Sequence, residues 1–255
     1  MFIVISGTIF TAALKKRDAA WVVSMKINAD FDSRVVVHSA QLEWLESPMK
    51  GVYRRPLDRI GAEVARATSI VKYDPNSKFS PHTHTGGEEF FVLDGVFQDE
   101  SGDYPSGSYI RNPPQSRHTP GSESGCIIFV KLWQFMPEDR THVCLNTNFM
   151  QAVPHRGMTN VSVMPLYKDD YEEVSIEYWA ANSMVTVEAD NGLEVLVIDG
   201  SFVDGEDSLV KHSWVRLGGG DSLNAKTGAV GAKVWVKRNH LKNVDDQILR
   251  VSSVK

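Results

Sequence analysis

Short runs of β-branched and aromatic residues dominate the chain from about residue 35 onward. Five runs stand out between Gly, Pro, Asn or Asp residues: RVVVH (34–38), ATSIVKY (67–73), EEFFVLDGVF (88–97), SYIRN (108–112) and CIIFVKLWQF (126–135). Such a pattern is typical of strands in an antiparallel sandwich or barrel. Helical spacing of apolar residues occurs only in AQLEWLE (40–46) and DRIGAEVARA (58–67), so we expect an all-β fold with helix confined to these segments.

The strand pattern occurs twice along the chain. Residues 73–118 fall on residues 178–223 when shifted by 105 positions, and ten of the 46 positions are identical. The best-matching pair is LDGVFQD (93–99) and IDGSFVD (198–204). A repeat of this length is far longer than a solenoid unit, so it predicts two copies of one β domain. We place the first copy at residues 25–142 and the second at residues 143–255, because the strand pattern lapses around this boundary.

Residues 1–24 are treated separately from the two copies. MFIVISGTIFTAAL (1–14) is apolar, but its basic residues follow the apolar run, whereas a secretory signal places them first. Met25 opens MKINADF, which is typical of a native start. We therefore expect residues 1–24 to be an extension or a misassigned start.

The stretch HTHTGGEE (82–89) predicts either a metal site or a polar turn. His82 and His84 are two residues apart, so on a strand both rings project from one face, and Glu88 re-enters after a Gly-Gly turn. With His118 they form a mixed nitrogen and oxygen donor set that suits Zn, Fe, Mn, Ni or Cu. The second copy replaces all four polar residues by apolar ones: Val187, Ala189, Leu193 and Leu223. Because polar groups in such an interior are costly unless something satisfies them, we favour the metal site.

Glu89 is the neighbouring carboxylate, and it recurs as Glu194 in the copy that lacks the histidines. Neighbouring side chains on a strand face opposite ways, so only one of the two carboxylates can reach a metal. We therefore expect Glu88 to be the ligand and Glu89 to be structural.

Composition narrows the function classes. The net charge is −5 over 255 residues with no basic cluster, which argues against direct nucleic-acid binding. No apolar stretch is long enough to span a membrane. The two cysteines, Cys126 and Cys144, give neither a disulfide framework nor a four-thiolate zinc site. We expect a cytoplasmic protein.

These residues resemble the motifs of the cupin superfamily. The first motif, H-x-H-x3-E-x6-G, is met by His82, His84, Glu88 and Gly95. The second motif is met by Gly107, Pro113 and His118, although Gln115 stands where its inner glycine is expected and its final Asn is missing. Residues 40–135 are most similar to the ChrR cupin-like family.

The resemblance implies two tandem cupin barrels, of which the first holds one divalent metal through His82, His84, Glu88 and His118. The expected metal is zinc or iron, with manganese and nickel as alternatives. The second barrel is expected to be degenerate and to lack metal ligands. It also implies that two cupin barrels pair, either as an intramolecular pseudo-dimer or in a homodimer.

Stand-alone proteins of this group resemble dioxygenases that cleave diketones and aryl ketones. That likeness favours a small-molecule, metal-dependent dioxygenase as the function. Charge stabilisation in such a pocket would come from basic or phenolic residues. Tyr109, Arg117 and Lys131 are the candidates, whereas Arg111 recurs as Arg216 in the copy without a site and is expected to be structural.

The alternative function is a ChrR-like sensor of singlet oxygen or peroxide that is linked to sigma-factor control. In that family a separate N-terminal zinc domain grips the sigma factor. The residues before 40 contain no cysteine, so we expect no sigma-factor partner of that kind.

Overall fold

The computed structural model describes residues 4–5, 8–9, 11–17, 20–62 and 64–254. The chain forms two compact units. The first comprises residues 1–29, 44–144 and 244–255, and the second comprises residues 30–43 and 145–243. The main passage between them lies close to the boundary expected from the repeat. Residues 30–43 come before the first barrel in the sequence but belong to the second unit. Residues 244–255 come after the second barrel but belong to the first unit.

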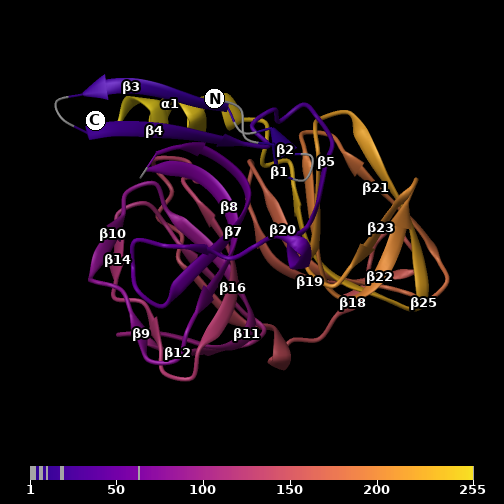
Figure 1. Ribbon diagram of the computed structural model, residues 1–255. Helices are drawn as coiled ribbons and strands as arrows, with labels where there is room; N and C mark the ends of the chain where they lie inside the picture. Colours follow the sequence, from indigo (N-terminus) through magenta and orange to yellow (C-terminus); the bar gives the residue numbers. More distant parts are fainter. Residues whose placement is uncertain (1–3, 6–7, 10, 18–19, 63, 255) are drawn as a thin grey trace. The chain divides into compact units, whose positions relative to one another are not determined.

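Antiparallel strands build the first unit, coloured indigo to magenta in Figure 1. In chain order they are β1 (Val4–Ile5), β2 (Thr8–Ile9), β3 (Thr11–Arg17), β4 (Ala20–Ile27), β6 (Leu45–Glu46), β7 (Val52–Gly61), β8 (Ala65–Tyr73), β9 (Ser77–Lys78), β10 (His82–His84), β11 (Glu88–Asp99), β12 (Gly102–Pro105), β13 (Ser108–Asn112), β14 (Ser116–His118), β15 (Gly121–Ser122), β16 (Cys126–Leu132) and β17 (Val143–Asn146), which leads into the second unit. The main path of the sheet is β17-β13-β11-β16-β8-β7-β4-β3, and β10 pairs only with β14. Of the strands assigned within residues 1–24, β3 joins this sheet through β4, whereas β1 and β2 pair with each other as a separate sheet.

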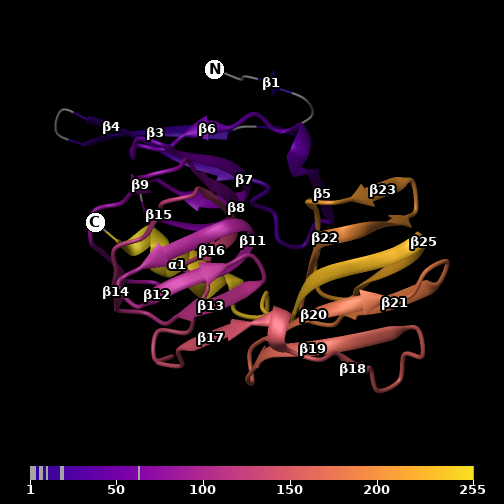
Figure 2. The ribbon, with the colours of Figure 1, turned by 90° about the horizontal axis from the view of Figure 1, so that it is seen from below.

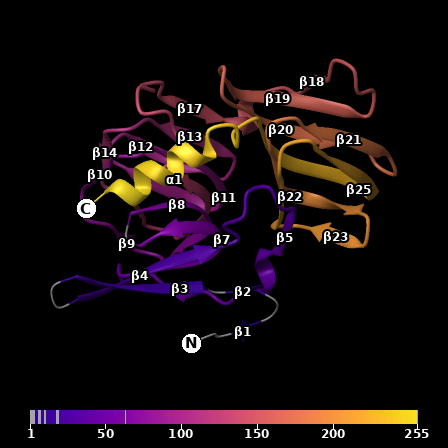
Figure 3. The same ribbon diagram turned by 90° about the horizontal axis from the view of Figure 1, so that it is seen from above.

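One α-helix, α1 (Val244–Ser253), lies against β7 and β8 of the first unit (Figure 3). Asp245 and Asp246 in its first turn and Arg250 in its last turn complement the helix dipole. Its buried Gln247 accepts a hydrogen bond of 2.8 Å from Arg66 Nε. No helix was expected in this segment from the sequence.

The two segments with helical spacing are not α-helices, so that prediction was wrong. Residues 40–46 contain a short 3-10 turn, η1 (Ser39–Gln41), and then β6. Residues 58–67 run from β7 into β8, and these two strands pair along their whole length. Cross-strand pairing therefore overrides the local apolar spacing.

The second unit repeats the arrangement (Figure 2). Its elements are β5 (Val35–His38), η2 (Thr147–Phe149), β18 (Val153–Pro154), β19 (Val161–Lys168), β20 (Glu173–Trp179), β21 (Met184–Ala189), β22 (Leu193–Asp204), β23 (Asp207–Val210), β24 (Ser213–Leu217) and β25 (Asp221–Arg238). Here β5, although it precedes the first barrel in the sequence, pairs with β24 at the edge of the sheet.

Each unit encloses its own apolar core. In the first, inward side chains of β11 and β16 such as Phe90, Val92 and Val130 pack together. In the second, Val195 and Val197 of β22 and Val236 of β25 occupy the matching places. Gly95 and Gly200 both have positive φ, and a Cβ at either would lie within 2.2 Å of a facing carbonyl oxygen. The prediction of two tandem β-barrels is confirmed.

Candidate metal centre

Three histidines converge inside the first barrel. His82 and His84 project from one face of β10, and His118 comes from β14, where it pairs directly with His82. One ring nitrogen from each histidine lies within 4.8 Å of the others, so this group could hold a metal ion. Glu88 opens β11, and its side chain faces inward like the core residue Phe90 two positions later.

The donor atoms lie at distances that suit one shared ion. His84 Nε2 is 2.8 Å from His118 Nε2. Glu88 Oε2 is 3.3 Å from His84 Nε2 and 3.4 Å from His118 Nε2. Two ligand atoms bound at about 2.1 Å to the same ion, at tetrahedral or right angles, lie roughly 3.0–3.4 Å apart. Both distances from Glu88 fall in this range, and the distance between the two rings is slightly shorter. The residues present therefore fit a divalent metal.

Polar neighbours orient the donors. His82 Nδ1 lies 3.0 Å from the carbonyl oxygen of Ser80, and His118 Nδ1 lies 3.1 Å from Asp99 Oδ2. Asn112 Nδ2 donates to Glu88 Oε2 at 3.3 Å. When the Nδ1 atom of a ring bonds an acceptor, it carries the proton and leaves Nε2 free to bind a metal.

Burial and nearby charges shift the pKa values of this group in opposite directions. Burial lowers the pKa of His84 against the opposing charge of Glu88, and the neighbouring rings of His118 and His82 lower it further. Burial also opposes protonation of His118, but the hydrogen bond to Asp99 and the charge of Glu88 outweigh it and raise the pKa of His118. The same hydrogen bond helps to lower the pKa of Asp99 although burial acts the other way.

The turn after His84 is fixed by the backbone. The His84 carbonyl oxygen accepts from the N–H of Gly87 at 3.2 Å and from the N–H of Gln115 at 2.9 Å. The Trp133 ring lies so close to Gly86 that a Cβ there would be 2.1 Å from Trp133 Cδ2. Glycine at this position therefore lets the indole pack against the turn that carries His84.

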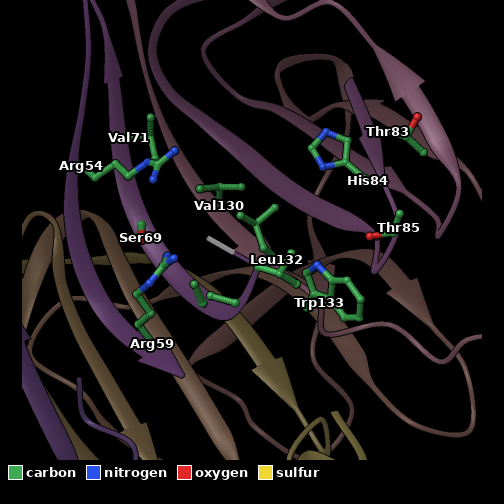
Figure 4. Close-up of a pocket in the computed structure, with 14 residues that line it drawn as sticks. Arg54, Arg59, Ser69, Val71, Thr83, His84, Thr85, Val130, Leu132 and Trp133 are labelled. Carbon is green, nitrogen blue, oxygen red and sulfur yellow. The ribbon is translucent and has the colours of Figure 1, made fainter. Parts of the chain in front are cut away.

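A pocket of about 190 Å³ opens beside His84 (Figure 4). Arg54 and Arg59 extend from β7 on one side of it, and His84 and Trp133 lie on the other. Val130 and Leu132 lie between them. Burial lowers the pKa of both arginines.

Of the three residues that the sequence suggested for the pocket, the structure places none in its lining. Lys131 pairs with Glu89 rather than with Glu88 and so lies on the outer face of its strand. Tyr109 lies on the same outer face, where its hydroxyl donates to Glu89 Oε1 at 2.6 Å. Arg117 is exposed on β14. The structure thus differs from the expectation because the register turns these side chains away.

The second unit repeats this outer-face cluster. Trp214 Nε1 donates to Glu194 Oε2 at 3.1 Å, as Tyr109 does to Glu89. Glu194 pairs with Arg216 and Lys237, as Glu89 pairs with Arg111 and Lys131. Both arginines stack on a phenylalanine ring, Arg111 at 4.1 Å and Arg216 at 4.2 Å. A cluster present in both barrels, with and without histidines, is structural.

Sequence reasoning missed Asn112, Asp99 and Arg54. Asn112 could have been found from the sequence. Its counterpart in the second copy is the apolar Leu217, just as the counterparts of the four predicted ligands are apolar. Asp99 recurs as Asp204 and therefore looked like scaffold. Arg54 lies outside the ungapped repeat, so only the structure places it in the pocket.

Comparisons with known proteins agree with this fold. Residues 32–136 match the ChrR Cupin-like domain family. A protein from Nostoc punctiforme proposed to be a dioxygenase is similar in structure, with a TM-score of 0.68 at 14% identity over 83% of this chain and 85% of that one. The pirin YhhW from Escherichia coli in complex with nickel gives a TM-score of 0.58 at 11% identity over 80% and 98%. A variant of oxalate decarboxylase from Bacillus subtilis gives 0.54 at 10% identity over 79% and 76%.

No curated protein matches the sequence significantly. Within the part of the chain that the structure describes, no helix has the length and apolar character needed to cross a membrane.

Proposed function

Starting from a ChrR cupin-like domain at residues 32–136 within a two-barrel cupin fold, we propose that the protein is a mononuclear, metal-dependent dioxygenase that acts on small diketones or aryl ketones. One observation carries the proposal: His84, one of the three converging histidines, lines a pocket of about 190 Å³. A purely structural metal site would be closed by its ligands, whereas this one has space for a substrate beside His84.

His82, His84 and His118 are the proposed ligands, and Glu88 is the fourth. Glu88 is included because its carboxylate lies against two of the three rings. Asn112 holds Glu88 in place, and Asp99 holds His118. Four protein ligands leave coordination positions for a substrate on a metal that accepts five or six ligands.

A metal bound there would polarise the carbonyl oxygens of the substrate and exchange electrons with dioxygen. The chain itself supplies the wall that positions the substrate: Val130 and Leu132 offer apolar contact, and Trp133 offers a flat face. Dioxygenase cleavage of a carbon–carbon bond keeps both oxygen atoms in the products, so no external reductant is needed.

The test combines metal analysis of the protein as purified with oxygen uptake on a panel of β-diketones and hydroxylated aryl ketones. The proposal expects iron, manganese or nickel at one ion per chain together with substrate-dependent uptake. His84→Ala should abolish both, whereas His142→Ala, an exposed histidine, should change neither. If His84→Ala retained stoichiometric metal, the ligand assignment would be wrong.

A second function is favoured by the match of residues 32–136 to the ChrR family. In this alternative the metal barrel senses an oxidant and passes the change to a partner. One tightly held zinc per chain without oxygen uptake on any ketone would support sensing over catalysis.

A further inference from the structure

The pocket beside His84 carries positive charge without a matching acid. Its lining includes the guanidinium groups of Arg54 and Arg59, and no aspartate or glutamate is among the lining residues described by the structure. Arg59 donates to the carbonyl oxygen of Ala62. For Arg54, the described residues provide no hydrogen bond or ion pair, and its side chain is half-buried in the pocket wall. A guanidinium placed in this way can donate to the carboxylate of a bound ligand.

A bulge in β7 places both arginines on the inner face. Arg54 pairs with Val71 before the bulge, and Arg59 pairs with Ala67 after it. The register shifts between Pro56 and Asp58, which turns Asp58 to the outer face, 3.6 Å from Arg66. Without this shift the inner face would carry an acid where it now carries Arg59.

The second barrel shows how this fold satisfies an inner guanidinium with its own residues. Arg238 occupies the place of Leu132, and its Nη2 lies 2.7 Å from Glu177 Oε1, where the first barrel has Val71. The counterpart of Arg54 there is Val163, which pairs with Glu177. The position of Arg54 is therefore polar only in the barrel that holds the histidines. Arg54 also lacks a carboxylate partner of the kind that Arg238 has in Glu177.

We propose that a ligand supplies this carboxylate, so that the pocket binds a small oxo acid whose carboxylate pairs with Arg54 while its carbonyl oxygens face His84. This inference rests on the proposed function, since it names the substrate class of the same site. Guanidinium and carboxylate form parallel hydrogen bonds, which fixes orientation as well as charge. A cavity of about 150 Å³ holds benzene, so a pocket of about 190 Å³ suits a ligand somewhat larger than benzene.

Two ligands of equal size test the proposal. In 2,4-dioxopentanoate and 5-methylhexane-2,4-dione the same β-diketone ends in a carboxylate or in an isopropyl group, with the same number of non-hydrogen atoms. Binding to the metal-loaded protein is measured by calorimetry under nitrogen, so that no turnover occurs. We expect wild type to bind the acid about 10- to 100-fold more tightly, the range of a hydrogen-bonded charge pair.

Arg54→Met should erase this preference, so that the acid and the neutral diketone bind about equally, while the metal content is unchanged. Arg55→Met is the matched control, because Arg55 neighbours Arg54 on β7 but stacks on Trp44 at 4.1 Å. It removes the same charge and should retain the preference. A preference that survives in Arg54→Met would show that the carboxylate binds the metal instead, which overturns the inference.

Failure of the inference and failure of the proposed function give different results. Equal binding of the two ligands by wild type, with diketone-dependent oxygen uptake intact, would overturn the inference alone. Binding of neither ligand together with an absence of uptake would overturn both. The comparison within wild type remains decisive even if Arg54→Met does not fold.

Discussion

The two barrels are built on the same frame but have opposite interiors. β11 and β22 are each 12 residues long, and both carry a bulge two residues before their glycine, Gly95 or Gly200. In the pair of strands that holds the site, His82 opposite His118 becomes Val187 opposite Leu223. Strand pairing and turns can therefore persist while the enclosed chemistry is lost.

The difference shows what the polar interior depends on. Val187, Ala189, Leu193 and Leu223 are all buried in the core of the second barrel, which needs no ion. In the first barrel a carboxylate and three imidazoles occupy these places, and burying them is costly unless a cation binds them. The second barrel is thus a reference for what the first would be without its site.

Converting the first site into the second is the strongest test of this comparison. The variant His82→Val, His84→Ala, Glu88→Leu and His118→Leu should contain no metal, and a chelator should no longer alter its thermal unfolding. Because it removes buried polar groups, it should exceed metal-free wild type in stability by about 1–4 kcal/mol. Metal analysis and denaturant unfolding with and without chelator measure both effects. A variant less stable than metal-free wild type would mean that the two interiors are not interchangeable.

A smaller effect on metal binding is expected from replacing Asp99. The corresponding position in the second barrel is also an aspartate, Asp204. Only Asp99 contacts a histidine, whereas Asp204 bonds Arg34 at 2.9 Å. Asp99→Asn should weaken metal binding about 10- to 100-fold, since carboxylates behind a ligating imidazole orient it and raise its basicity. Competition with a chromogenic chelator measures the affinity.

Asp204→Asn is the matched control and should leave metal affinity unchanged. If the two variants behaved alike, the contact of Asp99 with His118 would have no role in metal binding.

The repeat explains how far sequence alone could reach. The sequence predicted β11, β22 and the group of three histidines, because these follow from the local strand pattern and from the fixed offset of 105 residues. It could not identify the exchange of residues 30–43 and 244–255 between the units, since β5 pairs with a strand far along the chain. Long-range pairing leaves no local pattern to read.

The pocket was misread for a related reason. Lys131 was expected in it, but whether Lys131 lies opposite Glu88 or Glu89 depends on register, and a shift of one residue reverses the face. Arg54 and Arg59 reach the pocket only because a bulge separates them. Neither register nor the bulge is set by the composition of the strands concerned.

The smallest predicted effect concerns the turn that departs from the cupin motif. Gln115 has a φ of 74°, and its counterpart at the same offset in the second barrel is Gly220, with a φ of 88°. Both barrels thus require a left-handed residue here, a conformation that costs a residue with a Cβ about 1–2 kcal/mol. Gln115 is exposed, so no core packing is lost on replacing it.

Gln115→Gly should therefore raise the unfolding midpoint by a few degrees, about 1 kcal/mol after allowing for the greater freedom of glycine in the unfolded chain. Gln115→Ala keeps the Cβ and should give no gain, which separates relief of backbone strain from loss of the amide side chain. Differential scanning calorimetry of the metal-loaded protein measures both variants. Equal midpoints for the two would show that the first barrel holds this turn without strain, and that its glycine was lost without cost.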